Sequence, residues 1–384
     1  MDLQKQIINY VNLAIFDRAV LPVGAPCDQQ ELYAMSKKHN ITELVGMGML
    51  RSGKYESLSQ DFVTLGVKYY FQYVSQNAET ERLVQALEKH KYPYVLLKGA
   101  KMRQFYSEPH LRTSCDIDVL TTQSDEAIHE LMKELGYTFV VDAGTTINYS
   151  KAPVVEFEMH RRLFAEEQDF NGYFARIWER TVPDEKGRCE RYLTDEDFYV
   201  YMIAHLAKHV NYYGCGFRPF VDVYLYHKKA PKSFDLVKAR KILKEIDLLD
   251  FEQRVCSLTN GWFETGVLTK EQERLTDFIF GAGLYGNQQI KSGQRIRKKG
   301  RGRASLLFYH VFPPLRVMRH MYPKLLKCPV FLPLAWLLRA FRMLFTGRKK
   351  VAAEMDKINS LDDGYMKELS AVMNDFGFEE GKNG

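Results

Sequence analysis

The sequence has few cysteines, and none of them are paired in a metal-binding or redox motif. Six cysteines lie far apart along the chain, and no two of them form a C-x-x-C motif. This spacing argues against a zinc site and a disulfide scaffold, and it favours a reducing, cytoplasmic compartment. The six are Cys27, Cys115, Cys189, Cys215, Cys256 and Cys328.

Long apolar runs are also missing. The first twenty residues contain no basic segment followed by a clean apolar run, so we expect no signal peptide. Near the C-terminus, prolines interrupt an apolar and aromatic stretch, and no part of it reaches the roughly 20 unbroken apolar residues that a membrane span needs. These prolines are Pro313, Pro314, Pro323, Pro329 and Pro333.

Acidic residues are absent between Lys291 and Lys350, a stretch with 16 of the chain's 54 basic residues. The rest of the chain therefore has 38 basic side chains against 48 acidic ones. We expect the segment 291–350 to begin as a basic loop, from 292 to 303, and to continue as short helices. Three roles stay open: docking on the acidic body, which we favour, peripheral contact with a membrane, or binding to a nucleic-acid backbone.

A chain of 384 residues is too long for one small core, and its 46% hydrophobic and 27% charged residues are those of a folded protein. Helical periodicity before residue 90 and short strands alternating with helices after it predict an α+β fold with a mixed sheet. Nothing in the sequence indicates an oligomer. We expect four regions: helices at 1–90, an α/β core at 91–185, a helical domain at 186–285 and the basic region 286–384.

The stretch from Tyr94 to Leu120 is the first candidate site. It has an apolar strand, a Lys-Gly turn, a short helix, a polar loop, and a second strand with Asp116 and Asp118. Side chains two residues apart on a strand share a face, so the two carboxylates lie side by side. Two adjacent negative charges against an apolar strand favour a divalent cation. The alternative is an exposed edge strand.

A second polar face follows on the predicted strand 154–160. Glu156, Glu158 and His160 alternate there with apolar residues, so they share one face. Glu158 is our candidate, and Glu156 is its direct rival. His160 either orients Glu158 or is a structural histidine.

Two further pairs are spaced four residues apart on predicted helices. His205 and His209 have metal-ligand spacing, but without a third ligand we prefer packing or hydrogen-bonding roles. Arg218 and Asp222 either pair with each other along the helix or line the cleft that faces the sheet.

Taken together, these motifs resemble a known family. The K-G turn, the run S-C-D-I-D-V-L, the later E-x-H and the run AHLAKH…FRPFVD are similar to those of the bacterial uncharacterised nucleotidyltransferase family, within the polymerase-beta-type nucleotidyltransferase superfamily. The resemblance covers roughly residues 30 to 260. It departs from the wider superfamily at the turn, where Lys98-Gly99-Ala100 stands in place of the usual Gly-Gly or Gly-Ser pair.

The resemblance implies a set of roles. Asp116 and Asp118 would hold one or two Mg²⁺ ions, and Glu158 would be the third carboxylate, as a metal ligand or as a base. The nucleotide-binding residues would be Lys98, Gly99, Arg112 and Ser114. By their charge alone, Lys98 and Arg112 could equally be ion-pair partners of the two aspartates.

The expected function is a Mg²⁺-dependent transfer of an NMP from an NTP such as ATP to an acceptor hydroxyl or phosphate, with release of pyrophosphate. The alternative is a non-catalytic protein that keeps the fold and acts as a nucleotide-binding or membrane-surface adaptor. The sequence leaves the acceptor and the preferred base open.

Overall fold

The computed structural model describes residues 2–21, 25–152, 155–166, 168, 170–284, 286, 288–299, 312–313, 315, 318, 322, 328–346 and 361–378. The chain forms two compact units. The first contains Met1–Lys208 and Gly216–Leu284, and the second contains His209–Cys215 and Tyr285–Gly384. The expected division into four regions stays a prediction.

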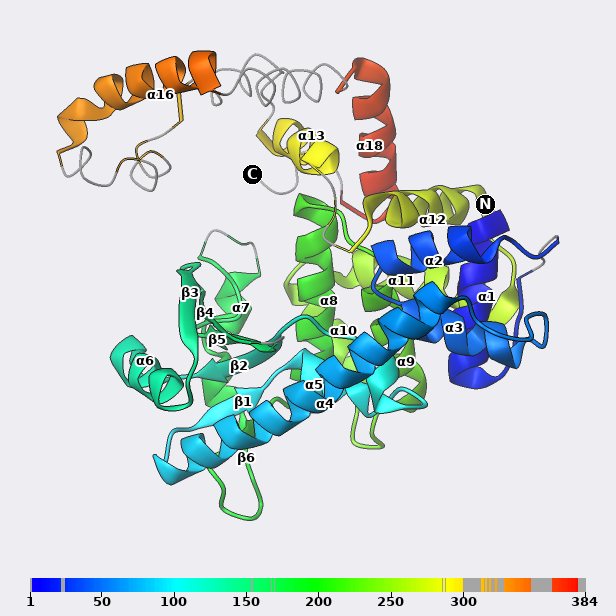
Figure 1. Cartoon of the computed structure of the whole chain (residues 1–384), viewed down its shortest axis with the longest axis horizontal. Helices are drawn as coiled ribbons and strands as arrows, with labels where there is room; N and C mark the ends of the chain where they lie inside the picture. The colour runs from blue at the N-terminus through cyan, green and yellow to red at the C-terminus, as the bar shows by residue number, and fades with distance from the viewer. Residues whose placement is uncertain are drawn as a thin grey trace. The chain divides into compact units, whose positions relative to one another are not determined.

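Four helices precede the sheet, as expected (Figure 1). Asp28 caps the second of them by accepting a hydrogen bond from the backbone N–H of Gln30 at 2.7 Å. The fourth is one continuous helix of 30 residues. The helices are α1 (Asp2–Phe16), α2 (Gln29–Lys38), α3 (Thr42–Arg51) and α4 (Gln60–Lys89).

A five-stranded sheet forms the centre of the first unit, with strand order β1-β2-β5-β4-β3. The β2 and β5 strands are parallel, and the other neighbours are antiparallel. The mixed sheet with flanking helices confirms the predicted α+β class. The strands are β1 (Tyr94–Leu96), β2 (Ile117–Thr121), β3 (Thr138–Asp142), β4 (Thr146–Lys151) and β5 (Val155–His160).

The sheet has one apolar face and one polar face. Ile117, Val119 and Phe157 pack in a buried cluster with Leu87 of α4 and Leu131 of α6 (Asp125–Glu134). Since side chains alternate along a strand, the residues between them, among them the candidate carboxylates, point to the opposite face. The short helix α5 (Lys98–Arg103) follows β1 in the connection that leads to β2.

The remaining elements of the first unit are mostly helical. Thr194 accepts a hydrogen bond from the N–H of Asp197 at 3.0 Å and so caps α8 (Asp195–Tyr212). The remaining elements are η1 (Pro109–Leu111), α7 (Asn171–Phe174), η2 (Ile177–Arg180), β6 (Val182–Pro183), β7 (Arg191–Tyr192), α8 (Asp195–Tyr212, of which the part from His209 on belongs to the second unit), α9 (Arg218–Lys229), α10 (Leu236–Glu245), α11 (Leu249–Asn260), the π-helical turn η3 (Gly261–Thr265) and α12 (Lys270–Ala282).

The second unit includes a helix where we expected a loop. Residues 292–299 of the predicted basic loop belong to α13 (Gln288–Lys299), and residues 300–303 lie outside the described part. Apolar contact explains the difference, because Gly293 lies against Leu369 of α18 so closely that a Cβ there would meet Leu369 Cδ2 at 2.6 Å. The other elements are η5 (Pro329–Phe331), α16 (Leu332–Thr346) and α18 (Asp363–Asp375).

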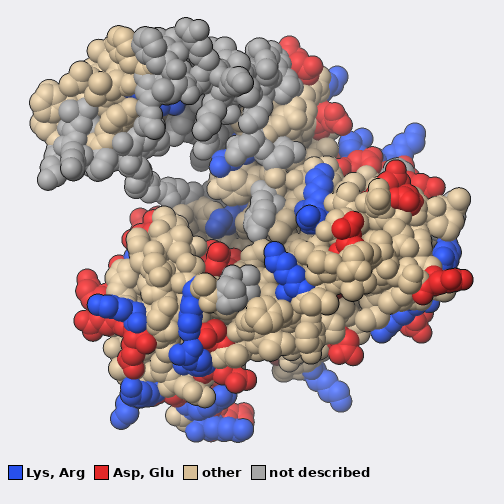
Figure 2. Space-filling model, viewed as in Figure 1, with Lys and Arg blue, Asp and Glu red and all other residues tan. Residues whose placement is uncertain are grey.

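The basic segment 291–350 falls largely outside the described residues, so its role stays a prediction. On the part of the surface that is described, Figure 2 shows basic and acidic side chains interspersed. Among the described residues, we find no helix with the length and apolar character that crossing a membrane requires.

His39 joins the N-terminal helices to the later helices of the first unit. It is fully buried; its Nε2 lies 3.2 Å from the carbonyl oxygen of Phe280, and its Nδ1 accepts a hydrogen bond from the N–H of Phe217 at 3.2 Å. Both contacts need the neutral ring, with its proton on Nε2. Burial lowers the pKa of His39 to about 4.

This burial predicts acid lability. Between the ordinary pKa of histidine and about 4, the unfolded state binds the proton and the folded state does not. Stability from this group is therefore complete above the ordinary pKa and is lost as pH falls, by up to about 3 kcal/mol. Urea unfolding at pH 5 to 8 should show this slope in wild type. His39→Leu should unfold more easily at pH 8 but with a shallower slope; an equal slope would contradict the assignment.

Candidate functional site

The parallel pairing of β2 and β5 brings two candidate carboxylates together. Asp118 on β2 is the register partner of Glu158 on β5, so their side chains lie next to each other on the polar face. Asp118 is buried, and Glu158 is half-buried. Glu156, the rival candidate two residues earlier on β5, is exposed.

His160 completes this group. Its Nε2 lies 3.0 Å from Oδ1 of Asp118 and 3.8 Å from Oε2 of Glu158. One ligand atom from each of Asp118, Glu158 and His160 falls within 4.8 Å of the others. Among the described residues, the buried Nδ1 of His160 has no hydrogen-bond partner.

Asn148 fixes the orientation of Glu158 from the neighbouring strand. Its Nδ2 donates to Oε1 of Glu158 at 3.0 Å, because the antiparallel register of β4 and β5 sets the two residues opposite each other. Asn148 is not among the residues predicted for the site, because the run TINYSK has too few apolar residues to stand out as a strand. Its alternation of polar and apolar residues was the available signal.

Asp116 lies just before β2, and its carboxylate is outside the group of three. Burial raises the pKa of Asp116, and the charge of Asp118 raises it further, while Lys98 and Arg218 oppose the shift. The pKa of Glu158 is raised by burial and by the charges of Asp116 and Asp118. The three carboxylates thus form one site of concentrated negative charge.

Asp118 differs from its neighbours because cations surround it. Burial raises its pKa, but Lys98 and the hydrogen bond from His160 lower it by more, so the net pKa lies below the usual range for an aspartate. Asp118 is therefore the carboxylate that stays ionised, and protons bind first at the other two.

One face of α8 borders the same site. Tyr201, His205 and Lys208 are spaced four and three residues apart, so they share a helix face. The Nζ of Lys98 lies 2.6 Å from Nε2 of His205. The hydroxyl of Tyr201 is buried, has no hydrogen-bond partner among the described residues, and lies within the field of Asp118 and Glu158.

Lys208 is a further cation that the sequence analysis missed. Burial and the charge of Lys98 lower its pKa, whereas Glu158 and Asp118 raise it. Since α8 is apolar on almost every side, no amphipathic pattern marked this face in the sequence. For His205, the contact with Lys98 agrees with the hydrogen-bonding role that we preferred; neither His205 nor His209 belongs to a described group that could hold a metal.

Arg112 lies in a buried ion pair. Its Nε and one terminal nitrogen donate to the two carboxylate oxygens of Asp222 at 2.9 and 2.8 Å, and the hydroxyl of Tyr106 donates to Oδ1 of Asp222 at 2.8 Å. The other terminal nitrogen donates to the carbonyl oxygen of Gly99 at 3.3 Å. Asp222 thus neutralises Arg112, and the phosphate-binding role expected of Arg112 stays untested.

The loop before β2 is fixed by local contacts. Ser114 donates from Oγ to the carbonyl oxygen of Asp116 at 2.8 Å, and Gln72 and Gln76 of α4 donate to the carbonyl oxygen of Ser114. A Cβ on Gly99 would lie 3.6 Å from Oγ of Ser114, an ordinary contact distance. The hydrogen bonds from Gln72 and Gln76 anchor the loop to α4.

The residues present fit a divalent cation of the Mg²⁺ type. Such ions prefer carboxylate oxygens, and they relieve the repulsion that raises the pKa of Glu158 and Asp116. A second described group, His227, Glu252 and Cys256, also has ligand atoms within 4.8 Å of one another. There Arg240 already neutralises Glu252 by donating from Nε at 3.0 Å, which makes it the weaker candidate.

A metal-binding titration separates Glu158 from Glu156. Glu158→Gln should weaken Mn²⁺ affinity at least about tenfold, because it removes a charged ligand, and the exposed Glu156→Gln should leave the affinity unchanged. Wild-type affinity should fall as pH falls, since protons compete for the carboxylates with raised pKa. Calorimetry measures both effects, and equal losses in the two variants would rule out this assignment.

Comparison with known proteins gives one match. No curated protein matches the chain. No solved structure matches it either. The model of a family described as uncharacterised nucleotidyltransferase matches residues 25–264, which include the whole site described above. The chain therefore belongs to the uncharacterised nucleotidyltransferase family.

Proposed function

We propose that the protein is a Mg²⁺-dependent nucleotidyltransferase that moves an NMP from an NTP to an acceptor hydroxyl or phosphate and releases pyrophosphate. The observation that carries the proposal is the pairing of Asp118 with Glu158 on one sheet face, beside Asp116. Membership of a nucleotidyltransferase family supports it. We further propose that the chain belongs to the polymerase-beta-type superfamily, on the strength of its strand, turn, helix and Asp-x-Asp strand.

Asp116, Asp118 and Glu158 would hold the metal. When bound, Mg²⁺ would neutralise phosphate charge and make the α-phosphorus more susceptible to attack. Of the three carboxylates, Asp118 is the one that stays ionised, because Lys98 and His160 keep its pKa low. His160 donates to Asp118 and so sets the direction of that carboxylate.

Glu158 is suited to receive the acceptor's proton. An oxygen of the acceptor forms a bond to the α-phosphorus as the bond to the bridging oxygen breaks, and pyrophosphate leaves with the electron pair. The hydroxyl proton then needs a base, and we assign this role to a carboxylate oxygen of Glu158. Asn148 holds Glu158 in position for this step.

Lys98 and Lys208 supply positive charge for the phosphates. The charge of Lys98 lowers the pKa of Asp116 and of Asp118. The charges of Asp118 and Glu158 raise the pKa of Lys208, so both cations lie near the carboxylates. We assign Arg112 to a supporting role, in which its bond to the carbonyl oxygen of Gly99 fixes the turn that Lys98 begins. This differs from the direct phosphate contact that the family resemblance implies.

A transfer assay tests the proposal. The purified protein, incubated with α-phosphate-labelled NTPs, Mg²⁺ and cell extract as a source of acceptors, should transfer label. The double variant Asp116→Asn with Asp118→Asn should lose at least about a hundredfold in rate, because the metal ligands are removed. Asp125→Asn, an aspartate on α6 that pairs with Arg161, is the matched control and should transfer as wild type does.

The alternative, a non-catalytic nucleotide-binding protein, gives a different result in the same samples. It predicts nucleotide binding by calorimetry without label transfer, whereas the absence of any Mg²⁺-dependent nucleotide binding excludes the enzyme directly. Transfer by the double variant at the wild-type rate would also refute the proposed site.

A further inference from the structure

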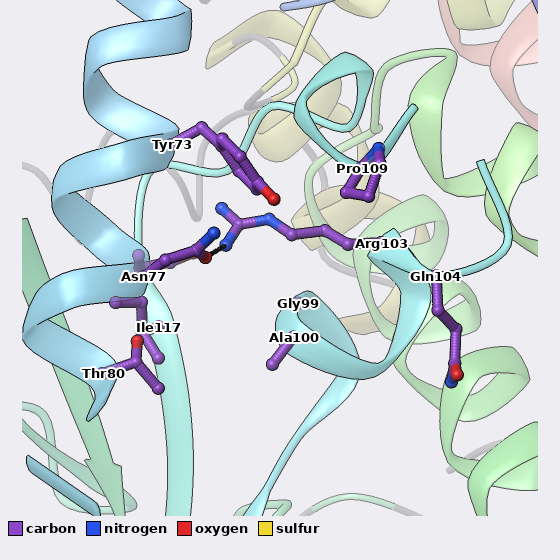
Figure 3. A pocket seen from close by; sticks show the side chains of 10 residues that line it. Tyr73, Asn77, Thr80, Gly99, Ala100, Arg103, Gln104, Pro109 and Ile117 are labelled. Atoms are coloured by element: carbon purple, nitrogen blue, oxygen red, sulfur yellow. Dashed lines mark hydrogen bonds between the residues drawn. The ribbon is translucent and has the colours of Figure 1, made fainter. Parts of the chain in front are cut away.

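A pocket lies between α4 and α5 (Figure 3). Its volume is about 270 Å³, close to the lower end of the range for small-molecule sites, about 300 Å³. Tyr73 and Thr80 line it from α4, and Ala100 and Arg103 line it from α5. Ile117 also lines it, and Ile117 points to the apolar face of the sheet, opposite to Asp118. Gly99 and Asp116 line it as well, so the pocket adjoins the proposed metal site at Asp116 but includes none of Asp118, Glu158 and His160.

Arg103 is the charged group of this pocket. It is 8% exposed, and its side chain extends from α5 toward α4 (Figure 3). One terminal nitrogen donates to Oδ1 of Asn77 at 3.1 Å, and the other donates to Oε1 of Gln76. The guanidinium carbon lies 5.2 Å from the centre of the Tyr73 ring, and Nε has no hydrogen-bond partner among the described residues.

The charge of Arg103 has no counterion in the described part of the chain. Amide oxygens satisfy its hydrogen bonds but do not neutralise it, and no described carboxylate forms an ion pair with it. An arginine is rarely buried without a paired carboxylate, because desolvation of an unpaired charge is costly. By contrast, the equally buried Arg112 has Asp222 as its partner.

Two further arginines act on the Arg103 end of the pocket. Burial, together with the positive charges of Arg112 and Arg218, lowers the pKa of Arg103 to about 10. A ligand that brings a negative charge would relieve both the missing counterion and the repulsion among the arginines.

We propose that the pocket between α4 and α5 binds a small organic anion, whose carboxylate or phosphate pairs with Arg103 and whose uncharged body lies along Tyr73 and Ala100. Asp116 also lines the pocket and repels a second negative charge, so the anionic group lies at the Arg103 end. The inference does not depend on the proposed transferase activity, because the anion pairs with Arg103 and none of Asp118, Glu158 and His160 lines the pocket.

Fragment binding tests this directly. Benzoate and phenyl phosphate, titrated into the full-length protein by calorimetry or ligand-observed NMR, should bind at least about tenfold more tightly than benzamide, the neutral analogue of benzoate. Arg103→Met, which keeps the length of the side chain without its charge, should remove this preference. Arg82→Met is the matched control on α4, because it removes an exposed arginine that pairs with Glu79, and it should bind as wild type does.

A pocket-filling variant covers the case in which Arg103→Met does not fold. Ala100→Leu keeps Arg103 but fills the pocket from α5, and it should also abolish binding of the anions. The inference is overturned if benzamide binds wild type as well as benzoate does, or if whichever of the two variants folds retains the anion preference.

Discussion

The parallel pairing of β2 with β5 is the constraint on which the rest of the site depends. It sets Asp118 beside Glu158, and a slip of one residue in that register would turn one carboxylate to the apolar face. The register is secured by burial, since Val119 and Phe157 must face α4 and α6 if the core is to close. The hydrophobic effect therefore fixes the positions of charged groups that by themselves repel each other.

A buried ion pair connects this sheet to the helical layer of the same unit. Arg112, in the loop before β2, pairs with Asp222 on α9, and the same guanidinium holds the turn at Gly99. Breaking such a pair leaves an uncompensated buried charge, at a cost of about 3–5 kcal/mol. The pair thereby ties the loop that leads to Asp116 to α9.

Local pattern in the sequence predicted which residues share a face, but not which elements become neighbours. Alternation along a strand was enough to group Asp116 with Asp118, and Glu158 with His160. The parallel contact between the two strands depends on chain topology, and β4, which lies beside β5, was missed because its apolar residues are few. Arg112 illustrates the same limit: its partner Asp222 is 110 positions away, so the sequence suggested the phosphates or the nearby Asp116 and Asp118 as its partners instead.

The central claim is that Asp118 and Glu158 hold a divalent metal that positions a nucleotide. The most direct test is a crystal structure with Mn²⁺ and a non-hydrolysable NTP, using the anomalous signal of manganese to locate the ion. We predict a peak within ligand distance of the carboxylates of Asp118 and Glu158, with the triphosphate toward Lys98. A peak at His227, Glu252 and Cys256 alone, or a nucleotide bound without any metal at Asp118, would contradict the account.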